Sequence, residues 1–232
     1  MIKIKICGLF RGEDALAVNA AVPDFVGFVF VKGRRRYCSP VLAGELRKKI
    51  APEILSVGVF QDEDAEGIEE LYARGIISFA QLHGGESAEY VAALKKRCPR
   101  LSVIKALCAD GETGGLMSAV TRTVQADGLK QTNAASALNE FLREQAALYV
   151  RAGADFLLFD SGSGGTGRAF DRSVLRGIDS PFFIAGGINS DNIEAVLSFK
   201  PYAVDISGGA ETDGLKDAEK IIKLTETVRG SK

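Results

Sequence analysis

Eight short apolar runs recur along this chain of 232 residues, and each is followed at once by glycine or a polar side chain or reaches one within a few residues. Short apolar runs of this kind predict buried strands of a parallel sheet. Segments of helical composition separate them, and all but one pair of successive runs start roughly 20 to 30 residues apart. The runs occupy 2–6, 25–30, 55–60, 76–82, 101–107, 156–159, 181–185 and 203–206.

This alternation predicts an α/β protein that forms a single (β/α)8 barrel domain over residues 1–232. A doubly wound open sheet is the structural alternative. Eight regular units with nothing left over favour closure into a barrel. Helix signals agree with the alternation. Residues 12–21 have helical composition, Ser39-Pro40 opens a helix, and a helix over 64–74 ends at Gly75, while 87–97 forms another.

One interval breaks the regular spacing, between Leu107 and Phe156. Apolar residues at helical spacing predict a helix over 134–152, capped by Thr132 or Asn133. Residues 109–131 are then extra material in the fifth βα loop, which opens onto the catalytic face of such a barrel. A lid over the site and a plain surface insertion or subunit contact are both compatible with this segment.

The charge balance excludes several classes of partner. The chain has 29 basic and 30 acidic residues, so it has no global attraction to nucleic acid or to an anionic membrane. No apolar run approaches the roughly 20 residues of a membrane span. The N-terminus enters the fold at once rather than forming a signal peptide. Four scattered cysteines are expected to be reduced thiols of a cytoplasmic protein: Cys7, Cys38, Cys98 and Cys108.

Glycines follow the last three apolar runs, and this pattern predicts a phosphate site. Backbone N–H groups at glycine can approach a phosphate closely, and barrels of this type commonly bind phosphate after strands seven and eight. Tight turns without a ligand are the alternative. The candidate phosphate-binding residues are Gly165, Thr166, Gly167, Gly186, Gly187, Ser207 and Gly208.

Two strand ends carry ionisable groups of complementary type, Cys7 after the first run and Asp160 after the sixth. A thiol with a lowered pKa can act as a base and a carboxyl with a raised pKa as an acid, which suits moving a proton off carbon while protonating an oxygen. Alternatively, Cys7 is an inert buried thiol and Asp160 caps the next helix. The same ambiguity applies to Asp205.

The arginine run and the single histidine are further candidates for binding a substrate or a metal. The run 34–36 of three arginines is either a solvated loop or supplies one arginine that clamps a substrate carboxylate. His83 is the only histidine of the chain and has no Cys or carboxylate at ligand spacing, so we expect no metal site.

The chain resembles the phosphoribosylanthranilate isomerases of tryptophan biosynthesis along its whole length apart from 109–131. Eight motifs occur in the family's order, and any one of them alone would be weak. They are KIKICGL at 3–9, DFVGFVF at 24–30, RRRYCSP at 34–40, VGVF at 57–60, QLHG at 81–84, FLLFDSGSGGTGRAFD at 156–171, IAGGIN at 184–189 and VDISGGAE at 204–211. The family's fold is a (β/α)8 barrel, as the spacing predicts.

The resemblance implies an Amadori rearrangement of N-(5-phosphoribosyl)anthranilate, with no cofactor and no metal. Asp160 matches the acid that protonates the furanose oxygen, and Cys7 matches the base that removes the C2 proton. Arg36 matches the arginine that holds the anthranilate carboxylate, and Asp205 matches an aspartate near the sugar hydroxyls. We also expect Gln81 and His83, from the QLHG motif, to bind substrate.

The chain departs from the family pattern at the end of the eighth run, where DxSSGVE is replaced by residues 205–211, DISGGAE. Gly208 removes one hydroxyl from the expected phosphate site, which puts phosphate affinity in question. Two alternatives therefore stay open. One is a related sugar-phosphate isomerase with an altered amine substrate, and the other is a non-catalytic phosphate-binding barrel. The expected partner is a small phosphorylated molecule, and the chain is expected to be a monomer or a homodimer.

Overall fold

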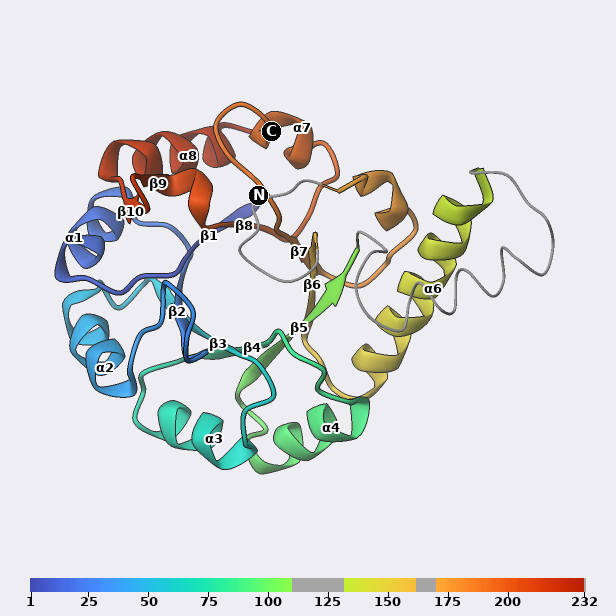
Figure 1. Cartoon of the computed structure of the whole chain (residues 1–232), viewed down its shortest axis with the longest axis horizontal. Coiled ribbons are helices and arrows are strands. Elements are labelled where there is room, and N and C mark those ends of the chain that lie inside the picture. Colours follow the sequence, from blue (N-terminus) through green and yellow to red (C-terminus); the bar gives the residue numbers. More distant parts are fainter. Residues whose placement is uncertain (110–131, 162–169, 232) are drawn as a thin grey trace.

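The computed structural model describes residues 1–109, 132–161 and 170–231. Eight parallel strands follow one another in chain order and close into a barrel, with β1 paired to β8, and helices surround the ring of strands (Figure 1). The predicted (β/α)8 barrel is therefore confirmed. The strands are β1 (Lys3–Cys7), β2 (Phe25–Val29), β3 (Leu55–Phe60), β4 (Phe79–Leu82), β5 (Ser102–Cys108), β6 (Phe156–Asp160), β7 (Phe182–Ile184) and β8 (Ala203–Ile206).

The helices and the short elements between them follow the same order. The α-helices are α1 (Gly12–Ala21), α2 (Pro40–Lys49), α3 (Ala65–Ala73), α4 (Ala88–Arg97), α6 (Thr132–Arg151), α7 (Ile193–Leu197) and α8 (Ala218–Gly230). Two 3-10 helices, η1 (Arg172–Leu175) and η2 (Gly208–Ala210), and a hairpin of β9 (Glu211–Thr212) and β10 (Leu215–Lys216) complete the described chain. None of its helices is both long and apolar enough to cross a membrane.

The predicted helix boundaries rest on the expected capping groups. The Ser39 hydroxyl accepts a hydrogen bond from the backbone N–H of Leu42 at 3.2 Å, with Pro40 in the first position of α2. Ser87 caps α4 in the same way. Gly75 follows α3 with φ of +67°, a conformation that glycine adopts without steric cost.

Two sequence-based boundaries were wrong. β4 begins at Phe79 and not at Ile76, because Ile76 and Ile77 are buried in the loop before the strand and extend the apolar run beyond it. Helix α6 already includes Thr132 and Asn133, so neither residue is its N-cap. Of the predicted insertion 109–131, only Ala109 belongs to the described residues. It is buried directly after β5.

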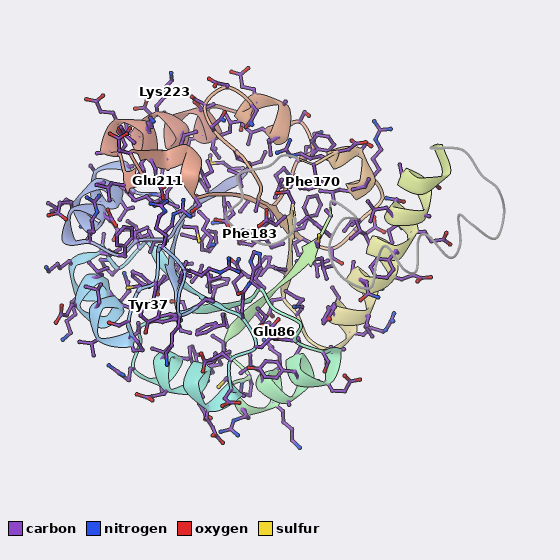
Figure 2. All side chains as sticks on the ribbon, viewed as in Figure 1. Tyr37, Glu86, Phe170, Phe183, Glu211 and Lys223 are labelled. Atoms are coloured by element: carbon purple, nitrogen blue, oxygen red, sulfur yellow. The ribbon has the colours of Figure 1, made fainter. Side chains whose placement is uncertain are left out.

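The barrel interior is filled in layers, because alternate side chains of each strand point inward. An apolar layer fills the amino-terminal end and includes Phe25, Phe79 and Phe183, and Figure 2 shows Phe183 within the ring of strands. Two residues after Phe79 in β4, the inward position holds Gln81 instead of an apolar side chain. In β1, the buried inward position holds Lys5. The core is therefore apolar at one end of the barrel and polar at the carboxyl ends of the strands.

Candidate active site

A cavity of roughly 520 Å³ lies at the carboxyl ends of the barrel strands. Every predicted site residue within the described part of the chain lines it. These residues are Cys7, Arg36, Gln81, His83, Asp160, Gly186, Gly187, Asp205, Ser207 and Gly208. The other three, Gly165, Thr166 and Gly167, lie outside the described residues. The strand-end positions singled out by the sequence thus meet in one site.

Cys7 is the last residue of β1 and pairs in register with Gly27 of β2. Gly27 makes room for the thiol, because a Cβ at that position would lie 2.7 Å from the Cys7 Sγ. Burial raises the pKa of the Cys7 thiol, and the ammonium groups of Lys5 and Lys216 oppose this effect. A base at Cys7 would therefore depend on these two cations to stabilise its thiolate.

Lys5 is a site residue that the sequence reasoning missed. Its side chain is fully buried, and Nζ donates to Gln81 Oε1 and to Asp205 Oδ2, both at 2.8 Å. Burial lowers the pKa of Lys5, but Asp205 and Cys7 outweigh it and raise the pKa above its ordinary value. The alternation of β1 could have revealed this lysine, since it lies two residues before Cys7 and therefore on the same face of the strand.

Asp160 ends β6 and lies on the other side of the cavity. Its Oδ1 accepts a hydrogen bond from the backbone N–H of Ser161 at 2.7 Å. Its Oδ2 lies 3.5 Å from His83 Nε2, and Gln81 Nε2 lies 2.8 Å from Nδ1 of the same ring. Gln81 and His83 thus connect Asp160 to Lys5. Asp205 keeps its other oxygen, Oδ1, buried and without a hydrogen-bond partner among the described residues, so this oxygen can accept a ligand hydroxyl.

Arg36 faces the cavity as part of an ion-pair network that sequence reasoning did not find. Its Nε and Nη2 donate to the two carboxylate oxygens of Glu211 at 2.6 and 2.9 Å, while Lys216 donates to Glu211 at 2.7 Å. Glu211 lies in the segment that leads from β8 to α8 and is labelled in Figure 2. The signal in the sequence was the dipeptide Asp213-Gly214, which turns the β9–β10 hairpin with positive φ at both residues and brings Glu211 and Lys216 together.

Three of the glycines after β7 and β8 occupy positions where a side chain would be strained or would collide. Gly186 and Gly187 have φ of +86° and +61°. A Cβ at Gly209 would collide with the Ile188 carbonyl, so the two loops approach each other closely at this point. Ser207 donates its hydroxyl to the Cys7 carbonyl at 3.1 Å, which ties the end of β8 to the end of β1.

These groups together can perform acid–base chemistry on an anionic ligand. A thiol and a carboxyl lie on strands three steps apart around the barrel, an arginine lines the same cavity, and two glycine-rich strand ends can accept a phosphate. Within residues 1–109, 132–161 and 170–231, no three Cys, His, Asp or Glu side chains are grouped as metal ligands.

Comparison with known proteins identifies the family. The sequence profile of the N-(5'-phosphoribosyl)anthranilate (PRA) isomerases matches residues 4–129 and 129–227. A relative of that name from Endomicrobium trichonymphae is 38% identical over 234 residues, covering 99% of each chain. The crystal structure of phosphoribosyl anthranilate isomerase from Thermus thermophilus superimposes with a TM-score of 0.77 at 29% identity and full coverage of both chains.

A further solved structure bears on the ligand of this family. It is a phosphoribosyl anthranilate isomerase in complex with reduced 1-(o-carboxyphenylamino)-1-deoxyribulose 5-phosphate. It is 26% identical to this chain, with a TM-score of 0.68 and coverage of 99% of this chain and 100% of that one. On the family profile and the full-length relatives, this chain belongs to the N-(5'-phosphoribosyl)anthranilate isomerase family.

Proposed function

We propose that this chain converts N-(5'-phosphoribosyl)anthranilate to 1-(2-carboxyphenylamino)-1-deoxyribulose 5-phosphate, with Cys7 as general base and Asp160 as general acid. The observation that carries these roles is that both side chains line the same cavity from β1 and β6, three steps apart around the barrel. A ligand between them can meet a base on one side and an acid on the other.

The reaction is an isomerisation, so the substrate and the product contain the same atoms and only protons are transferred. Asp160 gives a proton to the furanose ring oxygen, and the ring opens to a Schiff base between C1 and the anthranilate nitrogen. The Cys7 thiolate then takes the proton from C2, which leaves an enolamine. Proton transfer to C1 and loss of the C2 hydroxyl proton give the ketone. General acid and base groups of this kind each contribute about a hundredfold or more to turnover.

The remaining cavity residues suit the two anionic ends of this substrate. Arg36 donates two N–H groups to Glu211. The other N–H groups of its planar guanidinium can bind the anthranilate carboxylate. The phosphate would lie against Gly186, Gly187 and Gly208, where backbone N–H groups can reach it. A relative whose complex contains a phosphorylated ligand supports a phosphorylated substrate for this chain.

The test follows the fluorescence of N-(5'-phosphoribosyl)anthranilate, generated in situ from anthranilate, as the wild-type protein consumes it. Cys7→Ser and Asp160→Asn are each expected to lower turnover by at least about a hundredfold. Cys98→Ala is the matched control, because that thiol is buried at the end of α4, away from the cavity-lining residues, and its loss should leave turnover within about twofold of wild type.

Different outcomes contradict different parts of the proposal. Near-normal turnover in Cys7→Ser or Asp160→Asn would remove that residue from its role. Folded wild-type protein that consumes no substrate would refute the activity itself and direct the search to other phosphorylated aminosugars.

A further inference from the structure

Four polar side chains form a row across the barrel interior from β1 to β6. Lys5 Nζ lies 2.8 Å from Gln81 Oε1, Gln81 Nε2 lies 2.8 Å from His83 Nδ1, and His83 Nε2 lies 3.5 Å from Asp160 Oδ2. Lys5 is fully buried and Gln81 almost so, so water does not compete for the contact between these two side chains. The row joins the surroundings of Cys7 to the carboxyl group on the other side of the cavity.

Lys5, the first residue of the row, fixes the direction of the hydrogen bonds that follow. A lysine ammonium only donates, so the Gln81 carbonyl oxygen must face Lys5 and the amide NH2 must face His83. The contacts of Lys5 with Asp205 and Cys7 keep it protonated, since together they raise its pKa despite the effect of burial. An amide flip would place the NH2 group of Gln81 against the ammonium, with no acceptor between them.

The same logic extends to the imidazole ring. His83 Nδ1 faces an NH2 donor and must therefore accept, which places the single proton of the neutral ring on Nε2. The backbone of His83 is held as well, because its N–H donates to the Phe60 carbonyl at 2.8 Å and Gln61 donates to its own carbonyl at 3.3 Å. Nε2 then presents an N–H, not a lone pair, to Asp160 Oδ2.

This distinction matters because the Asp160 carboxyl group must be held in place to transfer a proton to substrate. A lone pair on Nε2 would face the lone pairs of Asp160 Oδ2 and repel them, whereas an N–H attracts that oxygen. We propose that Lys5, acting through Gln81, holds His83 in the tautomer with its proton on Nε2, and that this N–H positions the Asp160 carboxyl group at the cavity. His83 and Gln81 are positioning residues here, and the inference rests on the proposed role of Asp160 as the acid.

The tautomer can be measured directly, because His83 is the only histidine of the chain. Protein labelled with 15N in histidine gives one imidazole in a long-range 1H–15N spectrum of the resting enzyme. We expect a protonated, pyrrole-like Nε2 and an unprotonated, pyridine-like Nδ1. A proton on Nδ1, or rapid averaging between the two nitrogens, would overturn the inference without any variant being made.

Two substitutions of Gln81 then separate positioning from substrate contact. In Gln81→Glu, the new carboxylate can only accept, so the proton should move to Nδ1 and kcat should fall by at least about a hundredfold with KM changed less than about threefold. In Gln81→Met, a side chain of similar length imposes neither tautomer, so the loss in kcat should be smaller than in Gln81→Glu. Both proteins are checked for folding by circular dichroism.

If Gln81 instead bound substrate directly, both variants would raise KM to a similar degree and leave the tautomer unchanged, which would overturn the inference. Failure of the proposed function is a separate result. It would appear as wild-type protein without activity, whereas the tautomer of the resting enzyme is measured in the absence of substrate.

Discussion

Replacing Glu211 by glutamine tests the ion-pair network that holds Arg36 at the cavity. The Glu211 side chain is 5% exposed and accepts hydrogen bonds from Arg36, Lys216 and Arg35. Burial raises the pKa of Glu211, but these hydrogen bonds outweigh it and lower the pKa from 4.5 to about 2. Since one pKa unit corresponds to about 1.4 kcal/mol, the carboxylate contributes about 3 kcal/mol to the free energy of unfolding at neutral pH.

The sign of the pH dependence follows from the lowered pKa. The contribution of Glu211 is complete above its unfolded pKa of 4.5 and is lost as the pH falls toward about 2, because the folded state must then be protonated. Glu211→Gln should therefore lower the free energy of unfolding by about 3 kcal/mol at pH 7. The difference from wild type should shrink by roughly 1 kcal/mol on going to pH 4.

Urea unfolding followed by far-UV circular dichroism measures this difference, and the chain has no tryptophan to serve as a fluorescence probe. Glu70→Gln is the matched control, because Glu70 pairs with Arg74 at 2.9 Å on the surface of α3 and is 69% exposed. Its loss should cost less than about 0.5 kcal/mol. Equal stability of Glu211→Gln and wild type at pH 7, or a difference that stays constant down to pH 4, would refute the reasoning.

Three further predictions concern Cys7 and the buried ion pair of Lys105 with Glu86. Gly27→Ala should lower turnover by at least about tenfold, because the new Cβ displaces the Cys7 thiol. Gly12→Ala is the control and should keep its turnover, because a Cβ there meets nothing within 4 Å. Equal turnover of Gly27→Ala and wild type would refute the steric argument. Alkylation of Cys7, followed by peptide mass spectrometry, should accelerate about tenfold per pH unit up to at least pH 9, because burial raises the thiol pKa; a plateau near neutral pH would contradict this. Lys105→Met should lower the free energy of unfolding by about 3 kcal/mol or more in urea, because Glu86, 2.6 Å away and 1% exposed, loses its ammonium partner. The double variant Lys105→Met with Glu86→Gln should recover part of this loss. An unchanged urea midpoint in the single variant would disprove the pairing.

The barrel and the meeting of Cys7 and Asp160 at one cavity could be predicted from local patterns. Cys7 and Asp160 each end a short apolar run, and in a parallel barrel all such ends meet at one face. The prediction needed no knowledge of which strands are neighbours. The predicted family, fold and reaction class agree with the family profile and the full-length relatives. The roles of the individual side chains stay predictions until the variants are measured.

The partners of these residues could not be predicted in this way. Glu211 lies 175 residues from Arg36 in the sequence, and Lys5 lies 76 residues from Gln81. No local pattern relates residues so far apart, because their distance depends on the closure of the sheet and on the register between strands. Gly27 makes the same point, since its role in leaving room for the Cys7 thiol follows from the pairing of β1 with β2.

The sequence by itself determined that strands and helices alternate, which strand ends carry ionisable groups, and to which family the chain belongs. These features depend on side-chain periodicity and on residues close together in the chain. Only the tertiary structure decided that Lys5 is buried between Cys7, Gln81 and Asp205, and that Glu211 neutralises part of the charge around Arg36. A buried charge is stable only with its partners in place, and those partners are brought together by closure of the barrel.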